Sequence, residues 1–124
     1  MYPAVLVVNA VKKEADGICG MLRSAGYTPC IIDSLEGVED AVDANNCQAV
    51  LLDLDSFEVS NRAVRRITHR FPEVHFLCTS RKPFHPELED AIGFHFYACM
   101  QKPIDPVELR YWMKCIHQKM EDKA

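Results

Sequence analysis

The stretch Ala49-Val50-Leu51-Leu52-Asp53 is a short apolar run that ends on a carboxylate. A continuous apolar run of this length predicts a strand that is buried on both faces of a sheet. Similar runs occur at 4–8, where the run ends at Asn9, and at 74–78, where it ends at Thr79. The chain therefore contains several buried strands, each closed by a polar residue.

Segments with helical spacing of apolar residues separate these strands. They predict helices at 12–25, 34–46, 59–70, 86–92 and 105–118, and two further strands at about 27–32 and 94–101. Pro29 cannot donate to a ladder, so 27–32 is predicted to be an edge strand. Ser34 is the expected side-chain cap of the second helix. A proline-containing cap at 105–108 opens the last helix, which is expected to bury Val107, Leu109, Trp112 and Ile116.

Five strands alternating with five helices predict an α/β fold with a parallel sheet covered on both faces. The expected architecture is a three-layer, flavodoxin-like (βα)5 doubly wound sheet with strand order 2-1-3-4-5. We expect one domain over 1–124, with a core at about 4–117 and a polar tail at 118–124.

Composition excludes several classes of protein. The chain has 124 residues, of which 48% are apolar and 26% charged, as in an ordinary globular domain. It has no apolar run long enough to span a bilayer and no evident signal peptide, so a cytoplasmic location without membrane association is expected. The net charge of −4 argues against direct nucleic-acid binding. The six cysteines contain no C-x-x-C pair and are predicted to be reduced thiols.

In a doubly wound sheet, ligands bind beyond the carboxyl ends of the strands. The residues that close the five strands are Asn9, Asp33, Asp53, Thr79 and Lys102. A carboxylate can attack phosphorus, while a hydroxyl and an ammonium stabilise charge on the transferred oxygens. Each of these residues alone is an ordinary turn or loop residue, but their shared position predicts a phosphoryl site.

At this point the chain resembles the response-regulator receiver domains of bacterial two-component systems. The resemblance is carried by Val50-Leu51-Leu52-Asp53, Leu77-Cys78-Thr79-Ser80 and Lys102-Pro103, in this order. It implies that Asp53 accepts phosphate from a sensor histidine kinase, that Thr79 contacts the phosphoryl group after its loop shifts, and that Lys102 pairs with it. It also implies a Mg²⁺ site at Asp53, the backbone carbonyl of Asp55, and the end of the first strand.

The end of the first strand departs from the family pattern, since Asn9 and Ala10 replace a pair of acidic residues. Mg²⁺ relies on carboxylates, water and substrate phosphate, so the expected site at Asp53, Asp55 and Asn9 is weak. The carboxylate of Asp55 is a candidate to compensate. We also expect Lys102 to face fewer negative charges than in the family.

A second departure concerns the family's switch aromatic, which would fall at Cys99. Tyr97 lies two residues earlier and would share its face of the strand if the strand alternates regularly. The simpler expectation is that Phe96 and Tyr97 cover the edge of the sheet. A basic helical stripe at Arg62, Arg65, Arg66 and Arg70 is either a solvated face or a contact for an acidic partner.

Two hypotheses about function follow. The first is a phosphoacceptor switch that acts on a fused or separate output domain. The second is a phosphorylation-independent pseudo-receiver that serves as a protein-interaction module, which the residues Asn9 and Ala10 favour. In neither case is the chain a conventional enzyme, since it would at most transfer a phosphoryl group to itself and hydrolyse it. The sequence leaves open whether the chain forms a homodimer.

Overall fold

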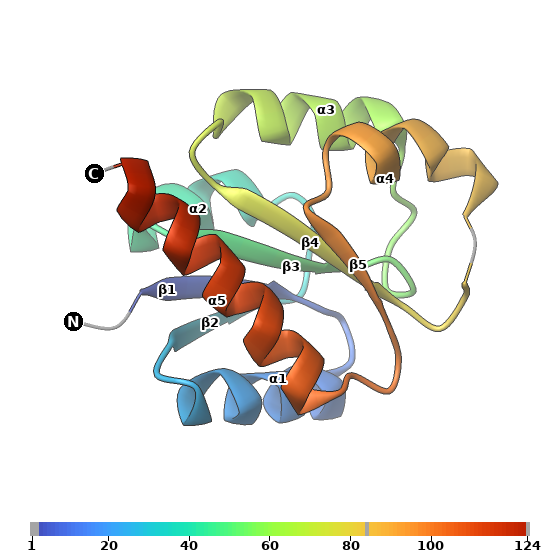
Figure 1. The fold of residues 1–124 in the computed structure, drawn as a ribbon. Coiled ribbons are helices and arrows are strands. Elements are labelled where there is room, and N and C mark those ends of the chain that lie inside the picture. The colour runs from blue at the N-terminus through green and yellow to red at the C-terminus, as the bar shows by residue number, and fades with distance from the viewer. Residues whose placement is uncertain (1–2, 84, 124) are drawn as a thin grey trace.

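The computed structural model describes residues 3–83 and 85–123, and in them five parallel strands alternate with helices (Figure 1). The strand order is β2-β1-β3-β4-β5, which confirms the predicted flavodoxin-like (βα)5 sheet. In chain order the elements are β1 (Ala4–Val8), α1 (Lys12–Ser24), β2 (Thr28–Ile32), α2 (Val38–Asn45), β3 (Ala49–Asp53), α3 (Asn61–Arg70), β4 (His75–Ser80), the 3₁₀ turn η1 (Pro86–Leu88), α4 (Glu89–Phe94), β5 (Ala98–Gln101) and α5 (Pro106–Lys123).

Burial along the strands follows their place in the sheet. All five residues of β3, at the centre, are buried, whereas β2 is only partly covered and Ile31 is 45% exposed. β2 pairs only with β1, so Pro29 lies on an edge strand as predicted. The continuous apolar run that begins at Ala49 therefore forms the central strand. A strand there must be apolar on both sides because helices cover both faces of the sheet.

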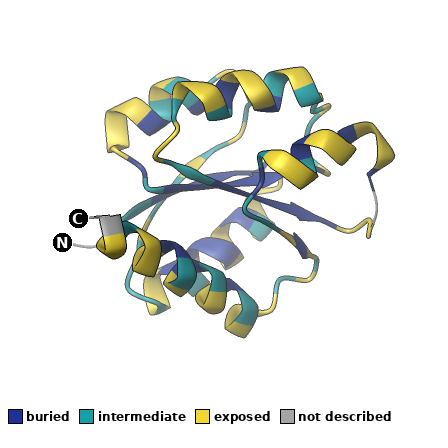
Figure 2. Cartoon of the chain, turned by 45° about the horizontal axis from the view of Figure 1, so that its top comes forward, coloured by how far each residue is buried: buried dark blue, intermediate teal, exposed yellow. Residues whose placement is uncertain are grey.

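Two apolar clusters, one on each face of the sheet, hold the three layers together (Figure 2). One joins the sheet to α2, α3 and α4 through residues such as Val42, Val64 and Ala91. The other joins it to α1 and α5 through residues such as Leu22 and Met113. The helices turn their exposed residues outward, and both faces of the sheet are covered.

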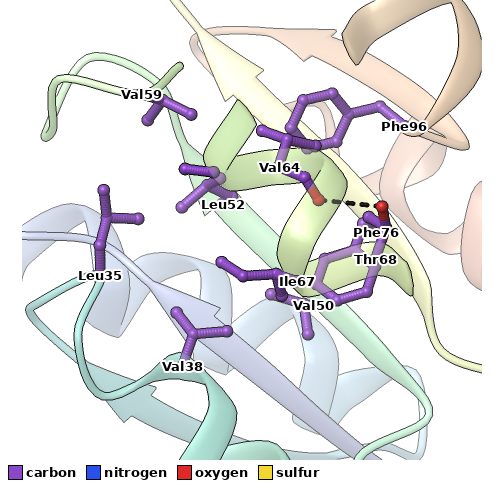
Figure 3. A pocket seen from close by; sticks show the side chains of 11 residues that line it. Leu35, Val38, Val50, Leu52, Val59, Val64, Ile67, Thr68, Phe76 and Phe96 are labelled. Atoms are coloured by element: carbon purple, nitrogen blue, oxygen red, sulfur yellow. Dashed lines mark hydrogen bonds between the residues drawn. The ribbon is translucent and has the colours of Figure 1, made fainter. Parts of the chain in front are cut away.

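The apolar layer under α3 encloses one small cavity, shown in Figure 3. Its volume is about 20 Å³, and nearly all of the side chains that line it are aliphatic or aromatic. The one hydroxyl, of Thr68, donates to the backbone carbonyl oxygen of Val64 at 2.9 Å. This space is far below the roughly 300 Å³ of a small-molecule site, so the core holds no ligand here.

Two predicted element boundaries are wrong. Ser34 does not cap α2, because the chain first makes a turn in which Val38 N–H donates to the Leu35 carbonyl, and the helix begins only at Val38. The fifth strand begins at Ala98 instead of 94, because Phe94 ends α4 and is 82% exposed.

The inward face of α5 also differs from the prediction. Val107 is 70% exposed, and the buried residues are Leu109, Met113 and Ile116, with Trp112 half-buried. The cap is confirmed, since Val107 N–H donates to Asp105 Oδ1 at 2.9 Å. Val107 therefore lies outside the buried stripe of α5, which runs along one side of the helix. The segment 118–123, expected to be a polar tail, continues the helix.

The basic stripe of α3 is partly neutralised by α2. Arg70 contacts Glu39 at 2.9 Å and Asp43 at 2.7 Å, and Arg66 contacts Glu39 at 3.6 Å. These are surface ion pairs, which typically contribute less than about 1 kcal/mol each. Within the described residues, no helix is long and apolar enough to cross a membrane.

Cys78 and Cys99 form a disulfide between β4 and β5, so the prediction that all six cysteines are reduced is wrong for this pair. The two residues are direct partners in the parallel register, with Cα atoms 4.6 Å apart. They are separated by 21 residues in sequence, so motif spacing does not reveal the pair. Cys78 is buried and Cys99 is exposed, which opens one side of the bond to solvent.

We expect Cys99→Ser to lower the free energy of unfolding of the oxidised protein by about 3 kcal/mol, the loop-closure contribution for a cross-link of this span. Urea denaturation with and without dithiothreitol measures this. With reductant, wild type and variant should unfold alike. Cys30→Ser, in edge strand β2, is the matched control. Dithiothreitol should destabilise this variant as much as it destabilises wild type. Equal stability of oxidised and reduced wild type would contradict the bond.

Candidate functional site

The carboxyl ends of the central strands bring an acid, an alcohol and an amine together, as predicted. Thr79 is the register partner of Asp53, and its hydroxyl donates to Asp53 Oδ1 at 2.9 Å. Lys102 directly follows β5, and its Nζ lies 2.6 Å from the same oxygen. Asp53 and Thr79 are each only 1% exposed. We call this group, with the side chains that contact it, the rim site.

Backbone contacts fix these side chains to neighbouring strands. Leu54 N–H donates to the Thr79 carbonyl at 2.9 Å, and Lys102 N–H donates to the Ser80 carbonyl at 2.8 Å. These bonds continue the β3–β4 and β4–β5 ladders by one step beyond the strands. The positions of the three groups therefore follow from sheet register rather than from loop conformation.

The Lys102 ammonium contacts three carboxylates, none of them from the first strand. Its Nζ lies 2.6 Å from Asp53, 2.7 Å from Glu14 and 3.1 Å from Asp55. The lysine side chain is 9% exposed. An ammonium has three N–H donors, and here each has a carboxylate partner. The charge that the first strand lacks is supplied by Glu14, in the first turn of α1.

Glu14 was missed by the sequence analysis. Its Oε1 also accepts from Asn9 Nδ2 at 3.3 Å, and its Oε2 accepts from Arg81 Nη2 at 3.1 Å. The only sequence signal is an acidic residue in the first turn of the helix after β1. Acidic residues are common there because they interact favourably with the helix dipole, so the signal does not distinguish a site residue.

The electrostatic consequences appear in the pKa values. The hydrogen bond from Lys102 holds the pKa of Glu14 below its usual value. Burial raises the pKa of Asp55, but hydrogen bonds from the Arg81 backbone and from Lys102 outweigh it, and the net shift is downward. For Lys102, burial alone lowers the pKa, and its hydrogen bonds to Asp53, Glu14 and Asp55 reverse this to a net increase. Lys102 and each of these carboxylates therefore stabilise each other's charged form.

The second oxygen of Asp53 is bonded to Ser56, another residue that was not predicted. The Ser56 hydroxyl donates to Asp53 Oδ2 at 2.5 Å and accepts from Ala10 N–H at 3.0 Å. Asn9 Oδ1 accepts from Val11 N–H at 2.8 Å and lies 3.3 Å from Ser56 Oγ. Ser56 thus bridges the ends of β1 and β3, and both oxygens of Asp53 have hydrogen-bond partners.

The predicted Mg²⁺ residues do not fit a divalent cation in this arrangement. Asp55 Oδ1 accepts from Ser80, and its Oδ2 accepts from Arg81 N–H and lies beside Lys102. Asn9 Oδ1 and both oxygens of Asp53 also accept from protein donors. A divalent cation needs several free oxygens, and here an ammonium lies among the carboxylates instead. The side chain of Asp55 therefore pairs with Lys102 and accepts hydrogen bonds from Ser80 and Arg81.

Not every predicted residue joins the rim site. Asp33 follows the edge strand β2 and is exposed. Tyr97 lies outside β5, and its ring packs edge-on against His75 and Trp112, on the α1–α5 face of the sheet. The expectation that Tyr97 shares a face with Cys99 is therefore wrong, because regular alternation does not extend beyond the strand.

Comparison with known proteins agrees with this architecture. No protein-family model and no curated protein match the sequence. A response regulator receiver domain protein from Methanospirillum hungatei JF-1 has a TM-score of 0.87 at 14% identity, over 100% of both chains. The signal receiver domain of an HD domain-containing protein from Pseudomonas fluorescens Pf-5 has a TM-score of 0.86 at 15% identity, over 98% of this chain and 99% of that one. A response regulator from Thermotoga maritima has a TM-score of 0.81 at 18% identity, over 94% and 98%.

The chain therefore has the fold of response-regulator receiver domains, as the sequence motifs predicted. At these identities the likeness concerns the fold, and the chemistry has to be argued from the rim site itself.

The lowered pKa of Glu14 predicts a pH-dependent contribution to stability. A carboxyl whose folded pKa lies below its unfolded value stabilises the fold above the unfolded pKa of about 4.5, and this stabilisation is lost as pH falls through the folded pKa. Glu14→Gln should therefore be less stable than wild type at pH 7, and the difference should shrink below about pH 4.5. Urea denaturation between pH 3 and 7 measures it. A difference that does not change with pH would contradict the ionic role.

Proposed function

We propose that the chain is a phosphoacceptor receiver domain of a two-component system, with Asp53 as the residue that is phosphorylated. The observation that carries the proposal is that Thr79 Oγ1 and Lys102 Nζ both lie within 3 Å of one oxygen of Asp53. A module that only docks needs no such convergence of nucleophile, hydroxyl and ammonium at the carboxyl end of its sheet. The phosphodonor would be a sensor histidine kinase in the cytoplasm, and the output domain would be fused or separate.

In the proposed step, an oxygen of Asp53 bonds to phosphorus while the N–P bond of a phosphohistidine breaks. The imidazole leaves with the electron pair and takes up a proton, and an acyl phosphate remains on Asp53. Lys102 and Thr79 bind the transferred oxygens, because a cation and a hydroxyl stabilise charge where it develops. The added charge then favours a new arrangement of the connections around the rim site.

Access to Asp53 requires a local change, since its side chain is 1% exposed and Ser56 donates to Oδ2. An open groove of about 440 Å³ lies beside Lys102, between α1 and the connection from β5 to α5. Met21 and Ile104 line its apolar part. A donor imidazole that enters here lies next to Lys102, which lines the groove, and Ser56 must release Oδ2 before attack.

We expect acetyl phosphate with Mg²⁺ to add one phosphoryl group to the wild-type chain, detected by intact mass. Beryllofluoride should shift the amide resonances around Asp53. Mg²⁺ should help only at high concentration, because Ser56 and Lys102 hold the oxygens that it needs. Lys102→Gln should slow the labelling about 100-fold, the effect typical of removing one group that stabilises developing charge.

Asp53→Asn should not be labelled at all, whereas Asp33→Asn, which removes an exposed carboxylate after the neighbouring strand, should be labelled like wild type. If the mass of the wild-type chain never changes, even at high Mg²⁺ concentration, the phosphoacceptor proposal is wrong.

The second candidate is a phosphorylation-independent pseudo-receiver that acts as a protein-interaction module. Two observations favour it: Ala10 supplies no ligand at the end of β1, and Ser56 donates to Asp53 Oδ2 while it accepts from Ala10 N–H. The rim site is then a complete internal network that stabilises the fold without a phosphoryl group or a divalent cation.

A partner purified on the immobilised chain separates the two candidates. If the chain is a pseudo-receiver, the partner should bind wild type and Asp53→Asn with equal affinity by calorimetry, before and after treatment with acetyl phosphate. A switch instead predicts that treatment changes the affinity for wild type and leaves that for Asp53→Asn unchanged.

A further inference from the structure

Glu14 contacts residues from three different segments at the carboxyl end of the sheet. Its Oε1 contacts Lys102, after β5, and Asn9, after β1, while its Oε2 contacts Arg81, after β4. The Glu14 side chain is 24% exposed, so these contacts are partly shielded from water. By contrast, Asp16 on the same helix is 58% exposed, and within the described part of the chain its ion pair is with Lys12, at 4.0 Å. The two acidic residues of α1 therefore have different surroundings, although they are two positions apart.

Glu14 supplies a carboxylate next to the end of β1, where the first strand has none. Ala10 has no polar side chain, and Asn9 brings no charge. α1 begins at Lys12, so its first turn lies next to the end of β1, and a glutamate there extends back across the rim. The result is that Lys102 has one carboxylate partner from α1, in addition to Asp53 and Asp55.

We propose that Glu14 is a positioning residue for phosphoryl transfer to Asp53, holding the Lys102 ammonium beside the acceptor carboxylate. The role rests on the proposed function, because it concerns the same reaction. Glu14 does not touch the reacting atoms and acts through Lys102. Glu14 supplies negative charge that the end of β1 lacks. Its partner is the Lys102 ammonium and not a metal ion.

The physical reason is preorganisation. A lysine side chain has four rotatable bonds and a strongly hydrated head, so an ammonium with fewer partners samples many positions. With three carboxylates around it, Lys102 is confined to one position beside Asp53 before any phosphoryl group arrives. When phosphoryl oxygens bind to Lys102, Glu14 keeps one of its three donors occupied, and the other two remain for the phosphoryl group and Asp55.

The lowered pKa of Glu14 agrees with this geometry, since the hydrogen bond from Lys102 is its largest cause. Glu14 is thus ionised at every pH at which the reaction is expected to run. The contact with Arg81 Nη2 adds a second cation to the same carboxylate, which keeps the β4–α4 connection near Lys102.

The test compares Glu14→Gln with Asp16→Asn, which removes the same charge from the exposed side of the same helix. Beryllofluoride affinity is measured by fluorine NMR at fixed Mg²⁺ concentration. We expect Glu14→Gln to weaken binding about tenfold to a hundredfold, the effect of one lost charge-assisted hydrogen bond. Asp16→Asn should bind like wild type, and Glu14→Asp should recover part of the loss because it keeps the charge.

A double-mutant cycle shows whether the effect passes through Lys102. In a Lys102→Met background, Glu14→Gln should cause no further loss of beryllofluoride affinity. If its loss is as large as in wild type, Glu14 acts independently of Lys102 and the positioning role is wrong. A merely structural role would persist in both backgrounds, so this readout separates the two.

Hydrogen exchange of the Lys102 ammonium, followed by nitrogen-detected NMR, makes the test independent of phosphoryl chemistry. It should be slow in wild type and Asp16→Asn, and faster in Glu14→Gln. Unchanged exchange in Glu14→Gln overturns the proposal. If wild type fails to bind beryllofluoride, the proposed function fails, while the exchange rates still decide whether Glu14 holds Lys102.

Discussion

The arrangement of the rim site depends on the charge of one ammonium group. Lys102 is 9% exposed, and a cation withdrawn from water to this extent needs compensating partners. Glu14 in α1 provides one of them, and Asp53 and Asp55 at the end of β3 provide the other two. The same requirement works in the other direction, because Asp53 is buried and needs Lys102 and Thr79 as donors. Four segments are thereby fixed relative to one another at the carboxyl end of the sheet.

The same contacts also oppose a reaction at Asp53. Both of its oxygens are bonded, one of them by Ser56, and the other residues of the site are satisfied as well. A phosphoryl group therefore has to displace existing contacts rather than fill an open site. The same closed network supports both candidate functions, since it preorganises the acceptor and also gives a pseudo-receiver a stable rim. What distinguishes the two is whether Ser56 releases Asp53 when a phosphoryl donor is present.

The sheet connects this site to the far edge strand. Thr79 follows Cys78 directly, and Cys78 is joined to Cys99 on β5. The strand that carries the hydroxyl of the site is therefore tied to its edge neighbour by a covalent bond as well as by the ladder. On the opposite face the ring of Tyr97 packs against Trp112 of α5.

The sequence alone determined the order of strands and helices and the residues at the strand ends. Apolar runs such as Ala49–Asp53 are long enough to specify buried strands, and parallel strands necessarily present their carboxyl ends at one side. Asp53, Thr79 and Lys102 were predictable for this reason.

Only the tertiary structure decided which groups meet around them. Glu14 resembles any acidic residue near a helix start, and the pair Cys78 and Cys99 shows no motif spacing. Their contacts depend on where the first turn of α1 lies relative to the end of β5, and on the register of β4 with β5. Those relations arise between segments distant in the chain, and local sequence patterns do not encode them.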